Sequence, residues 1–306
     1  MVESRVLGIA YSSWVSEAEP LAQDLADRLG KYGTVWMCPV SELDSKWETV
    51  PNPSLLVSVG GDGTILRAVR TIAKHDVPLL GVNLGRVGFM TELSVSDALS
   101  HIDEYIEGST WVEERAMLQA TVLPGGSDDG SSTFHGLNDA VVGRGTVARL
   151  VYAEVTVDGQ LLASYATDAV VISTATGSSG YILSAGGPVL YPESNSLIVK
   201  PVVPQMADPS AVVLRPGAVV EVFVQTNHQA MLSVDGFDDW ALKPEDVVRV
   251  EQSPYKAKFL RTGQPRFFPA GLAQRLSSSR KQDQDELITW VSEGRTRIDR
   301  RKFRWG

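Results

Sequence analysis

The chain of 306 residues is long enough for two packed domains, and its 43% hydrophobic and 21% charged residues are typical of a soluble globular protein. Its formal net charge of -9 argues against general nucleic-acid binding, and no apolar run approaches the roughly 18 residues of a membrane span. The single Cys38 excludes an internal disulfide, and residues 1–5 lack the pattern of a signal peptide. We therefore expect a cytoplasmic protein with no nucleic-acid or membrane partner.

The N-terminal part of the chain alternates between short apolar runs and segments with helical spacing of apolar residues. The expected strands cover residues 6–11, 34–38, 55–59 and 78–83, and the expected helices cover residues 20–29 and 64–74. Strands that alternate with helices form a parallel sheet with helices on its faces. Ligands of such sheets bind beyond the carboxyl ends of the strands, where residues 60–64 and 83–90 both lie.

A glycine-rich turn follows the third expected strand. Gly60, Gly61 and Gly63 have no Cβ, so backbone N–H groups in this turn can come close to a phosphate chain. Asp62 would repel phosphate, and its presence therefore needs a chemical reason. It could accept a proton from a hydroxyl that is being phosphorylated, or help to hold a metal ion that accompanies a nucleotide. The alternative is a strand-to-helix turn in which Asp62 caps the helix and the glycines serve only the turn geometry.

From residue 116 onward the pattern changes to short β-like runs separated by turns. These runs cover residues 116–123, 136–142, 150–157, 169–173, 219–226 and 231–234. Asp158-Gly159 and Asp235-Gly236 stand where hairpin turns are expected. We therefore expect an α/β domain with a parallel sheet over residues 1–115 and a mostly β domain over residues 116–262. Residues 263–306 form a helical and basic C-terminal segment, and the sequence leaves open whether it packs back on the first domain.

Four separated stretches carry motifs. They are residues 60–64, residues 81–92, residues 137–142, and Asp168 together with residues 174–188 (Thr-Ala-Thr-Gly-Ser-Ser-Gly-Tyr-Ile-Leu-Ser-Ala-Gly-Gly-Pro). In this order they resemble the motifs of the NAD kinase family, and together they cover residues 55–192. The Gly-Gly-Asp-Gly turn alone is shared with diacylglycerol kinases, sphingosine kinases and phosphofructokinases, whereas the fourth stretch is specific.

The resemblance implies a kinase that transfers phosphate from ATP to the adenosine-ribose 2′-hydroxyl of NAD, giving NADP, with Mg²⁺ or another divalent cation accompanying ATP. It implies a Rossmann-like first domain and a β-rich acceptor domain, and it makes Asp62 the general base. The resemblance also implies that the phosphates of ATP are bound by Gly60, Gly61, Gly63 and Thr64. It implies that the acceptor NAD is bound by Phe89, Asn138, Asp139, Asp168, Thr176, Ser179, Gly180, Tyr181 and Ser184. Because members of the family are dimers or tetramers with shared sites, a homodimer or homotetramer is expected.

Some of these acceptor residues also have a simpler structural interpretation. Asn138 and Asp139 could be the polar start of a strand, and Asp168 could be a strand-start residue. Phe89 could belong to the core. The amide of Asn138 both donates and accepts hydrogen bonds, and the carboxylate of Asp139 can accept from two adjacent hydroxyls, as ribose recognition requires.

The chain also departs from the family pattern. Asp139 replaces the usual Glu, Gly180 replaces Ala and Ala175 replaces Pro. In residues 200–209, Gln205 stands where His is usual, and the Arg-Pro pair that follows in the family is absent. These changes leave two alternatives open: a kinase of the same family that acts on another nucleoside, sugar or specialised metabolite, and a nucleotide-binding protein without activity. The intact Asp62 argues against the second.

Two further patterns carry little weight. Residues 143–148 fit a dinucleotide fingerprint as text, but a strand-like run follows them where a helix is required. The four histidines have no metal-ligand spacing, so we expect no metal site made by the protein alone.

Overall fold

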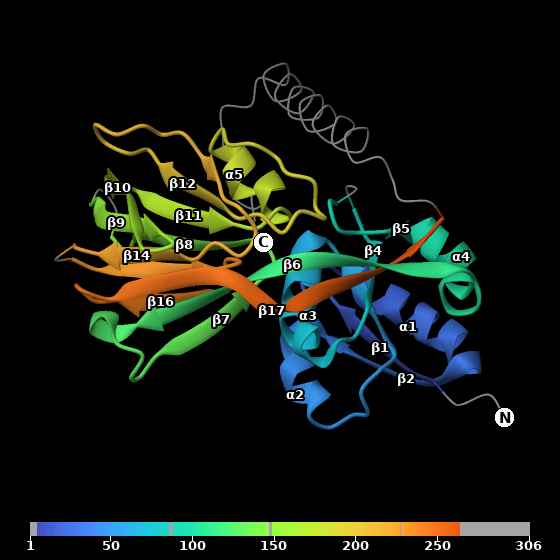
Figure 1. Cartoon of the computed structure of the whole chain (residues 1–306). Helices are drawn as coiled ribbons and strands as arrows, with labels where there is room; N and C mark the ends of the chain where they lie inside the picture. Colours follow the sequence, from blue (N-terminus) through green and yellow to red (C-terminus); the bar gives the residue numbers. More distant parts are fainter. Residues whose placement is uncertain (1–4, 86–87, 147–148, 227, 264–306) are drawn as a thin grey trace, which may run out of the picture. The chain divides into compact units, whose positions relative to one another are not determined.

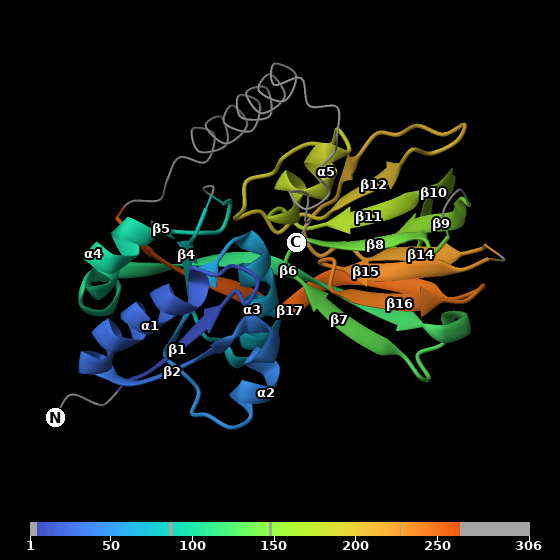
Figure 2. The same ribbon diagram turned by 180° about the vertical axis from the view of Figure 1, so that it is seen from behind.

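The computed structural model of the chain describes residues 5–85, 88–146, 149–226 and 228–263. The described residues up to Arg261 form one compact unit, which Figure 1 shows from one side and Figure 2 from behind. The sequence pattern predicts short helices near residues 267–276 and 285–292, and these and the basic end of the chain lie outside the described residues.

A parallel sheet in the order β2-β1-β3-β4 forms the N-terminal part of this unit. Its strands are β1 (Arg5–Tyr11), β2 (Gly33–Pro39), β3 (Leu55–Gly60) and β4 (Leu79–Asn83), and the short β5 (Leu93–Ser94) pairs with β4 in parallel. Every residue of β3 and β4 is buried, because this sheet is covered on both faces. The register pairs Gly60 with Asn83 at the carboxyl ends of β3 and β4. The two segments expected at the site therefore leave the sheet side by side.

Helices cover both faces of the parallel sheet (Figure 1). They are α1 (Ala18–Leu29), α2 (Leu43–Trp47), α3 (Asp62–Ile72) and α4 (Val95–Glu107). Residues of α1 and α4 join one apolar cluster and residues of α2 and α3 join the other. In α3 the buried side chains include Ile65, Val69 and Ile72, whose helical spacing fixes the helix on the sheet directly after β3. Within the described residues, no helix is both long and apolar enough to cross a membrane.

The chain is mostly β after α4. Its strands are β6 (Thr110–Leu123), β7 (Ser132–Gly136), β8 (Asp139–Arg144), β9 (Val151–Val157), β10 (Gln160–Thr167), β11 (Ala169–Ser173), β12 (Ile198–Val202), β13 (Val212–Val213), β14 (Val220–Val224), β15 (Ala230–Val234), β16 (Asp238–Leu242) and β17 (Val247–Thr262). The short helix α5 (Tyr181–Ser184) lies between β11 and β12, and short 3-10 helices cover Gly30–Tyr32, Val40–Glu42, Ala73–His75, Pro124–Gly126 and Gly177–Ser179.

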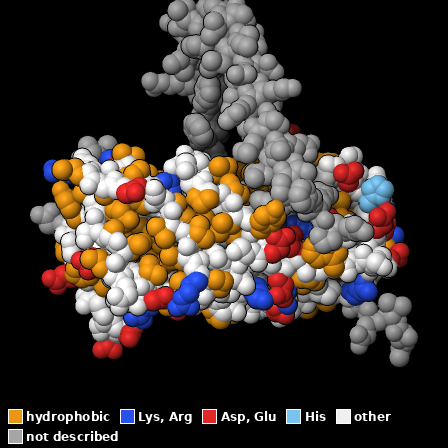
Figure 3. Space-filling model, turned by 45° about the horizontal axis from the view of Figure 1, so that its top comes forward, with side chains coloured by type: hydrophobic (Ala, Val, Ile, Leu, Met, Phe, Trp, Pro, Cys, Tyr) orange, Lys and Arg blue, Asp and Glu red, His pale blue; other side chains and the backbone are white. Residues whose placement is uncertain are grey.

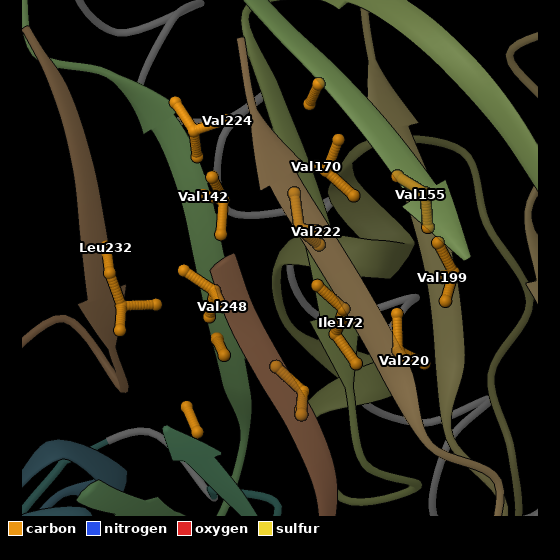
Figure 4. Packing of buried hydrophobic residues seen from close by; sticks show 14 of the residues in the cluster. Val142, Val155, Val170, Ile172, Val199, Val220, Val222, Val224, Leu232 and Val248 are labelled. Atoms are coloured by element: carbon orange, nitrogen blue, oxygen red, sulfur yellow. The ribbon is translucent and has the colours of Figure 1, made fainter. Parts of the chain in front are cut away.

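Two sheets pack face to face in this β part. One is antiparallel throughout, in the order β13-β12-β11-β8-β15-β16, and the other includes β10, β9, β14 and β17. Valine and leucine side chains from both sheets fill the space between them (Figure 4). Val142, Ile172 and Leu232 face Val155, Val222 and Val248 in one buried cluster. This core is large enough to hold the loops at the strand ends in place.

The long strand β17 belongs to both parts of the unit. Its beginning pairs with β14 in antiparallel fashion, as at Val220 and Val250, whereas Phe259 near its end pairs with Leu79 of β4 in parallel. One sheet therefore runs from the β part into the α/β part. In Figure 1 the red-orange ribbon of β17 can be followed from one part to the other.

The structure confirms the expected fold class and corrects one strand. Residues 136–142 do not form a single strand, since β7 ends at Gly136 and β8 begins at Asp139. Both expected hairpin turns are present, and Asp158 and Asp235 adopt positive φ angles of 51° and 52° before their glycines. The helix after the glycine turn begins at Asp62, two residues earlier than expected.

Candidate functional site

The glycine turn joins β3 to α3 at the carboxyl edge of the parallel sheet. Gly60 is the last residue of β3, and Gly61 is the extended N-cap of α3, with no side-chain cap. Gly61 and Gly63 are exposed, and a Cβ at either position would meet nothing within 4 Å. Their backbone N–H groups are therefore open to an anion, and the N-terminus of the eleven-residue helix α3 favours negative charge there.

Gly60 and Thr64 have a different role from their neighbours. A Cβ at Gly60 would lie 2.8 Å from the Cβ of Thr64, so the turn closes only with glycine at this position. Thr64 is buried, and its N–H donates to the carbonyl oxygen of Gly61 at 3.0 Å. Thr64 thus supports the turn from inside, whereas Gly61 and Gly63 form its outer surface.

The Asp62 carboxylate does not cap the helix that it begins. Its Oδ2 accepts a hydrogen bond from the N–H of Phe89 at 2.8 Å, and its Oδ1 accepts from the N–H of Met90 at 3.2 Å. Two amide donors on one carboxylate fix its direction. The structure therefore brings together the first and second sequence motifs, and Phe89 contributes its backbone to this contact.

Hydrogen bonds with two other segments fix the backbone of residues 137–139 in the third motif. The N–H groups of Leu137, Asn138 and Asp139 all donate to the carboxylate of Asp235, at 2.7, 2.8 and 3.0 Å. On the other side, the N–H of Thr174 donates to the carbonyl oxygen of Asn138 at 2.9 Å. Asp235 was expected only as a hairpin residue, and the structure adds that it orders residues 137–139.

Unpaired polar atoms lie in this segment and in the fourth motif that packs against it. Asn138 Oδ1 and Thr176 Oγ1 are buried and have no hydrogen-bond partner among the described residues. Buried polar atoms are normally paired, so an unpaired acceptor and an unpaired hydroxyl close to one motif point to a ligand that pairs with them. A Cβ at Gly177 would lie 2.5 Å from the backbone carbon of Asn138, which shows how closely the third and fourth motifs pack.

Asp139 is half-buried beside Asp235. Burial is the main cause that raises the pKa of the Asp139 carboxyl from 3.8 to about 7, and the nearby charge of Asp235 adds to the shift. Burial also raises the pKa of Asp235, although its three amide hydrogen bonds oppose this. A carboxyl group whose pKa is raised in this way by burial and a second carboxylate is typical of a functional site.

Tyr181 lies within electrostatic range of both Asp168 and Asp139. Burial raises the pKa of the Tyr181 hydroxyl, and the charges of Asp168 and Asp139 raise it further. Asp168 lies just before β11 and forms an ion pair with Arg144, whose Nη1 is 3.4 Å from Asp168 Oδ1. The Tyr181 side chain is 40% exposed, so its ring is accessible to a ligand. Arg144, the last residue of β8, was not predicted as a site residue because the dinucleotide-like pattern of residues 143–148 that contains it carries little weight.

Three small residues of the fourth motif serve local structure. The hydroxyl of Ser179 donates to the carbonyl oxygen of Thr176 at 3.0 Å, and the hydroxyl of Ser184 donates to that of Gly180 at 3.1 Å. A Cβ at Gly180 would meet only the carbonyl oxygen of Gly177, at 3.3 Å. These residues shape the short helical turns that carry Tyr181, and none of the three hydroxyl or backbone contacts reaches Asp139.

Helix α3 brings the two halves of the candidate site together. The Arg67 guanidinium carbon lies 4.1 Å from the ring centre of Phe237, in the turn after Asp235, and 5.0 Å from the ring centre of Trp14, in the loop after β1. The helix that begins at Asp62 therefore contacts the hairpin that orders residues 137–139. Arg67 had no motif to mark it in the sequence.

Two family models and several known proteins match this chain. The ATP-NAD kinase N-terminal domain model matches residues 51–110, and the ATP-NAD kinase C-terminal domain model matches residues 137–262. The chain is 39% identical to an NAD kinase of Dehalococcoides mccartyi over 89% of this chain and 96% of that protein. It is 41% identical to an NAD kinase of Symbiobacterium thermophilum over 74% of this chain and 79% of that protein. The chain belongs to the NAD kinase family.

Solved structures of the NAD kinase family share its fold. A crystal structure of an NAD kinase from Archaeoglobus fulgidus in complex with ATP has a TM-score of 0.67 and 25% identity, and it covers 83% of this chain and 92% of that one. The yeast NADH kinase complexed with NADH has a TM-score of 0.75 at 22% identity, covering 85% and 84% of the two chains. The N-terminal family model spans the turn with Asp62 and the segment that binds its carboxylate. The C-terminal model spans the segment around Asn138 and its supports.

The segment in which the sequence departs from the NAD kinase family follows β12. The N–H of Gln205 donates to the carbonyl oxygen of Ala166 at 2.7 Å, so its backbone is tied to β10. Val203 and Met206 have positive φ angles of 51° and 52° and are exposed. Figure 3 shows hydrophobic side chains spread over the face of the β part among scattered charges.

Proposed function

We propose that this protein is an NAD kinase that transfers the terminal phosphate of ATP to the 2′-hydroxyl of the adenosine ribose of NAD. Family membership supports the reaction class. The observation that carries the proposal is the position of Asp62, which is held by two amide donors beside the open backbone of Gly61 and Gly63. This arrangement places a carboxylate and a phosphate-binding turn within one loop, as phosphoryl transfer to a hydroxyl requires.

In this proposal Asp62 accepts the proton of the attacking hydroxyl. The N–H groups of the turn, at Gly60, Gly61 and Gly63, hold the donor phosphates, and Thr64 keeps the turn closed from inside. Catalysis then rests mainly on orientation and on neutralising charge. The two amide hydrogen bonds point the Asp62 carboxylate in one direction before the substrates bind.

In this proposal the segment around Asn138 binds the acceptor NAD. The unpaired Oδ1 of Asn138 and hydroxyl of Thr176 offer an acceptor and a donor to NAD, and Asp139 accepts from ribose hydroxyls. The exposed ring of Tyr181 is suited to stack on a base. Asp168 accepts from an amide or an exocyclic amine, and Phe89, Ser179, Gly180 and Ser184 shape the surrounding pocket.

A divalent cation such as Mg²⁺ fits this proposal. Within the described residues no group of three His, Cys, Asp or Glu side chains could hold a metal ion. Mg²⁺ bound to a nucleotide takes most of its ligands from phosphates and water and needs only one or two carboxylates. Asp62 is the carboxylate of the turn that could serve it, and the ion would neutralise charge on the phosphates.

The test is to incubate the protein with NAD, ATP and Mg²⁺ and to measure NADP. The Asp62→Asn variant should lose about 10²- to 10⁴-fold in kcat while its NAD affinity, measured by calorimetry, stays within a few-fold. Asp76→Asn is the matched control, because Asp76 is an exposed residue in the left-handed region, where Asn is tolerated. An Asp62→Asn protein that turns over as fast as the unchanged protein would contradict the base role.

A second candidate keeps the kinase and changes the acceptor. It is favoured by the segment after β12, where Gln205 replaces the usual His and the backbone at Val203 and Met206 is in the left-handed region. A panel of NAD, NADH, nucleosides and sugars, each with ATP, other nucleoside triphosphates and polyphosphate, separates the two candidates. Phosphorylation of another acceptor with no NADP formed would select the second. We also propose a homodimer or homotetramer, which light scattering tests.

A further inference from the structure

A buried cluster of four charged side chains contacts the segment whose backbone binds the Asp62 carboxylate. It consists of Glu92, Glu113, Arg115 and Arg261, which we call the Arg261 cluster. Arg261 Nε lies 2.7 Å from Glu113 Oε2, and Arg115 Nε lies 2.7 Å from Glu113 Oε1. Arg261 Nη1 lies 3.1 Å from Glu92 Oε2. Each of the four side chains is at most 10% exposed, and the charges balance as two positive and two negative.

The cluster joins three segments that are distant in the sequence. Glu113 and Arg115 lie on β6, Arg261 lies near the end of β17, and Glu92 follows the loop after β4. The guanidinium carbons of Arg115 and Arg261 lie 4.8 and 5.1 Å from the ring centre of Phe259. Burial lowers the pKa of Arg115. Burial also acts on Glu113, but the charges of Arg115 and Arg261 outweigh it and lower the pKa of that carboxyl, so the ionised form is favoured.

Arg261 also reaches the backbone that holds Asp62. Its Nη1 and Nη2 donate to the carbonyl oxygen of Met90 at 3.3 and 3.4 Å. The N–H of the same Met90 donates to Asp62 Oδ1 at 3.2 Å. The N–H of Glu92 donates to the carbonyl oxygen of Gly81 in β4 at 2.8 Å, so the segment is anchored on both sides of Met90. One residue thus separates Arg261 from the Asp62 carboxylate.

A gain in folding stability is not enough to explain why this cluster is buried. Removing four charges from water costs more than a well-packed apolar core of the same volume, and buried ion pairs add little net stability. What the guanidinium adds is geometry, because its planar donors contact the Met90 carbonyl, Glu92 and Glu113 at the same time. A lysine has one ammonium and cannot make all three contacts from one position.

We infer that Arg261 is a positioning residue for phosphoryl transfer, because it fixes the Met90 backbone whose N–H directs the Asp62 carboxylate. The inference rests on the proposed role of Asp62 as the base. A displacement of about 1 Å at a reacting group costs up to about 100-fold in rate. We expect loss of the Arg261 contacts to lower kcat and to leave KM almost unchanged, since Arg261 is buried and does not form a substrate surface.

The test compares Arg261→Lys with Arg249→Lys. Arg249 lies near the other end of the same strand β17 and pairs with Glu221 at 3.0 Å, but it is 36% exposed and does not belong to the cluster. We expect Arg261→Lys to lower kcat by about 10- to 100-fold, with the KM values for NAD and ATP changed less than about threefold. Arg249→Lys should leave all three constants unchanged. A rise in KM with unchanged kcat, or equal effects in the two variants, would overturn the inference.

Two further measurements separate positioning from general stability. Hydrogen exchange at the Phe89 and Met90 amides should be faster in Arg261→Lys than in Arg249→Lys, and this readout needs no turnover. In an Asp62→Asn background, Arg261→Lys should cause almost no further loss of kcat, because the carboxylate that it directs is already gone. Unchanged exchange, or a fully additive loss, would contradict a positioning role.

The outcomes distinguish this inference from the proposed function. If Asp62→Asn keeps full activity, the proposed base role fails. If Asp62→Asn is inactive and Arg261→Lys is not impaired, only the inference fails. Should Arg261→Lys not fold, Glu113→Gln loosens Arg261 with little change in shape, and it should lower kcat in the same direction with KM preserved. A Glu113→Gln protein that folds and retains normal kcat and normal amide exchange would overturn the inference.

Discussion

The Asp62 carboxylate occupies the space that a side chain at Gly88 would need. A Cβ built on Gly88 would lie 2.7 Å from Asp62 Cγ and 2.9 Å from its Oδ2. Real Cβ atoms do not approach other atoms this closely, so either the carboxylate or the backbone of the segment has to move. Gly88 is therefore required by the carboxylate rather than by its own backbone conformation.

We predict that Gly88→Ala displaces Asp62 and lowers kcat by about 100-fold. Thermal unfolding should change by only a few degrees, because the segment lies at the edge of the sheet and not in its core. Steady-state kinetics and calorimetry measure the two effects. Gly85→Ala is the matched control in the same loop, since a Cβ there would meet nothing within 4 Å. Equal rates for the two variants would show that Asp62 tolerates displacement.

The pKa of Asp139 predicts how stability depends on pH. Burial and the charge of Asp235 raise the pKa of Asp139 from 3.8 to about 7 in the folded protein. Between about pH 4 and pH 7 the folded state therefore binds a proton that the unfolded state has released. Stability contributed by the neutral carboxyl is complete below about pH 4 and is lost as the pH rises to 7.

Asp139→Asn removes this loss, because the amide stays neutral at every pH. We expect the free energy of unfolding of the variant, relative to the unchanged protein, to rise between pH 5 and pH 8 by about 2 kcal/mol. Thermal or urea unfolding at pH 5, 6, 7 and 8 measures this difference. Asp129→Asn, in the exposed loop before β7, is the control. A difference that stays constant over this pH range would exclude titration of Asp139 near neutral pH.

Local patterns were sufficient to predict the frame of the site. The apolar run that ends at Gly60 and the helical spacing after it predict β3, the turn and α3, because sequence neighbours decide these elements. The helix α4 also has such a pattern, with buried Ala98, Ile102, Tyr105 and Ile106 and a Ser94 cap that accepts from the N–H of Asp97. A search for helix caps would have found it.

The features that the sequence pattern did not predict depend on contacts between residues that are distant in the sequence. The break between β7 and β8 arises because Leu137 and Asn138 donate to Asp235, almost 100 residues away, instead of to a neighbouring strand. The Arg261 cluster escaped prediction because charged residues are normally exposed, and Arg261 is buried only through partners 148 and 169 residues earlier. No local pattern contains such pairings.

Asp158 and Asp235 form a natural pair for comparison. Both precede a glycine in a hairpin turn, with φ angles of 51° and 52°. Asp158 is partly exposed, and its carboxylate accepts from the N–H of Val219 and pairs with Arg215. Asp235 instead accepts from the three consecutive N–H groups of residues 137–139. The two residues share turn geometry and differ in what their carboxylates hold.

We predict that Asp235→Ala lowers the free energy of unfolding by roughly 3 kcal/mol, because it leaves three partly buried N–H groups without an acceptor. Asp158→Ala should lower the free energy of unfolding much less, since Asp158 is exposed and water can replace most of its contacts. The KM for NAD should rise in Asp235→Ala alone, because the Asn138 segment loses its support on one side. Urea unfolding and steady-state kinetics on both variants measure these effects. Similar losses of stability and an unchanged KM in both would mean that Asp235 serves only its own turn.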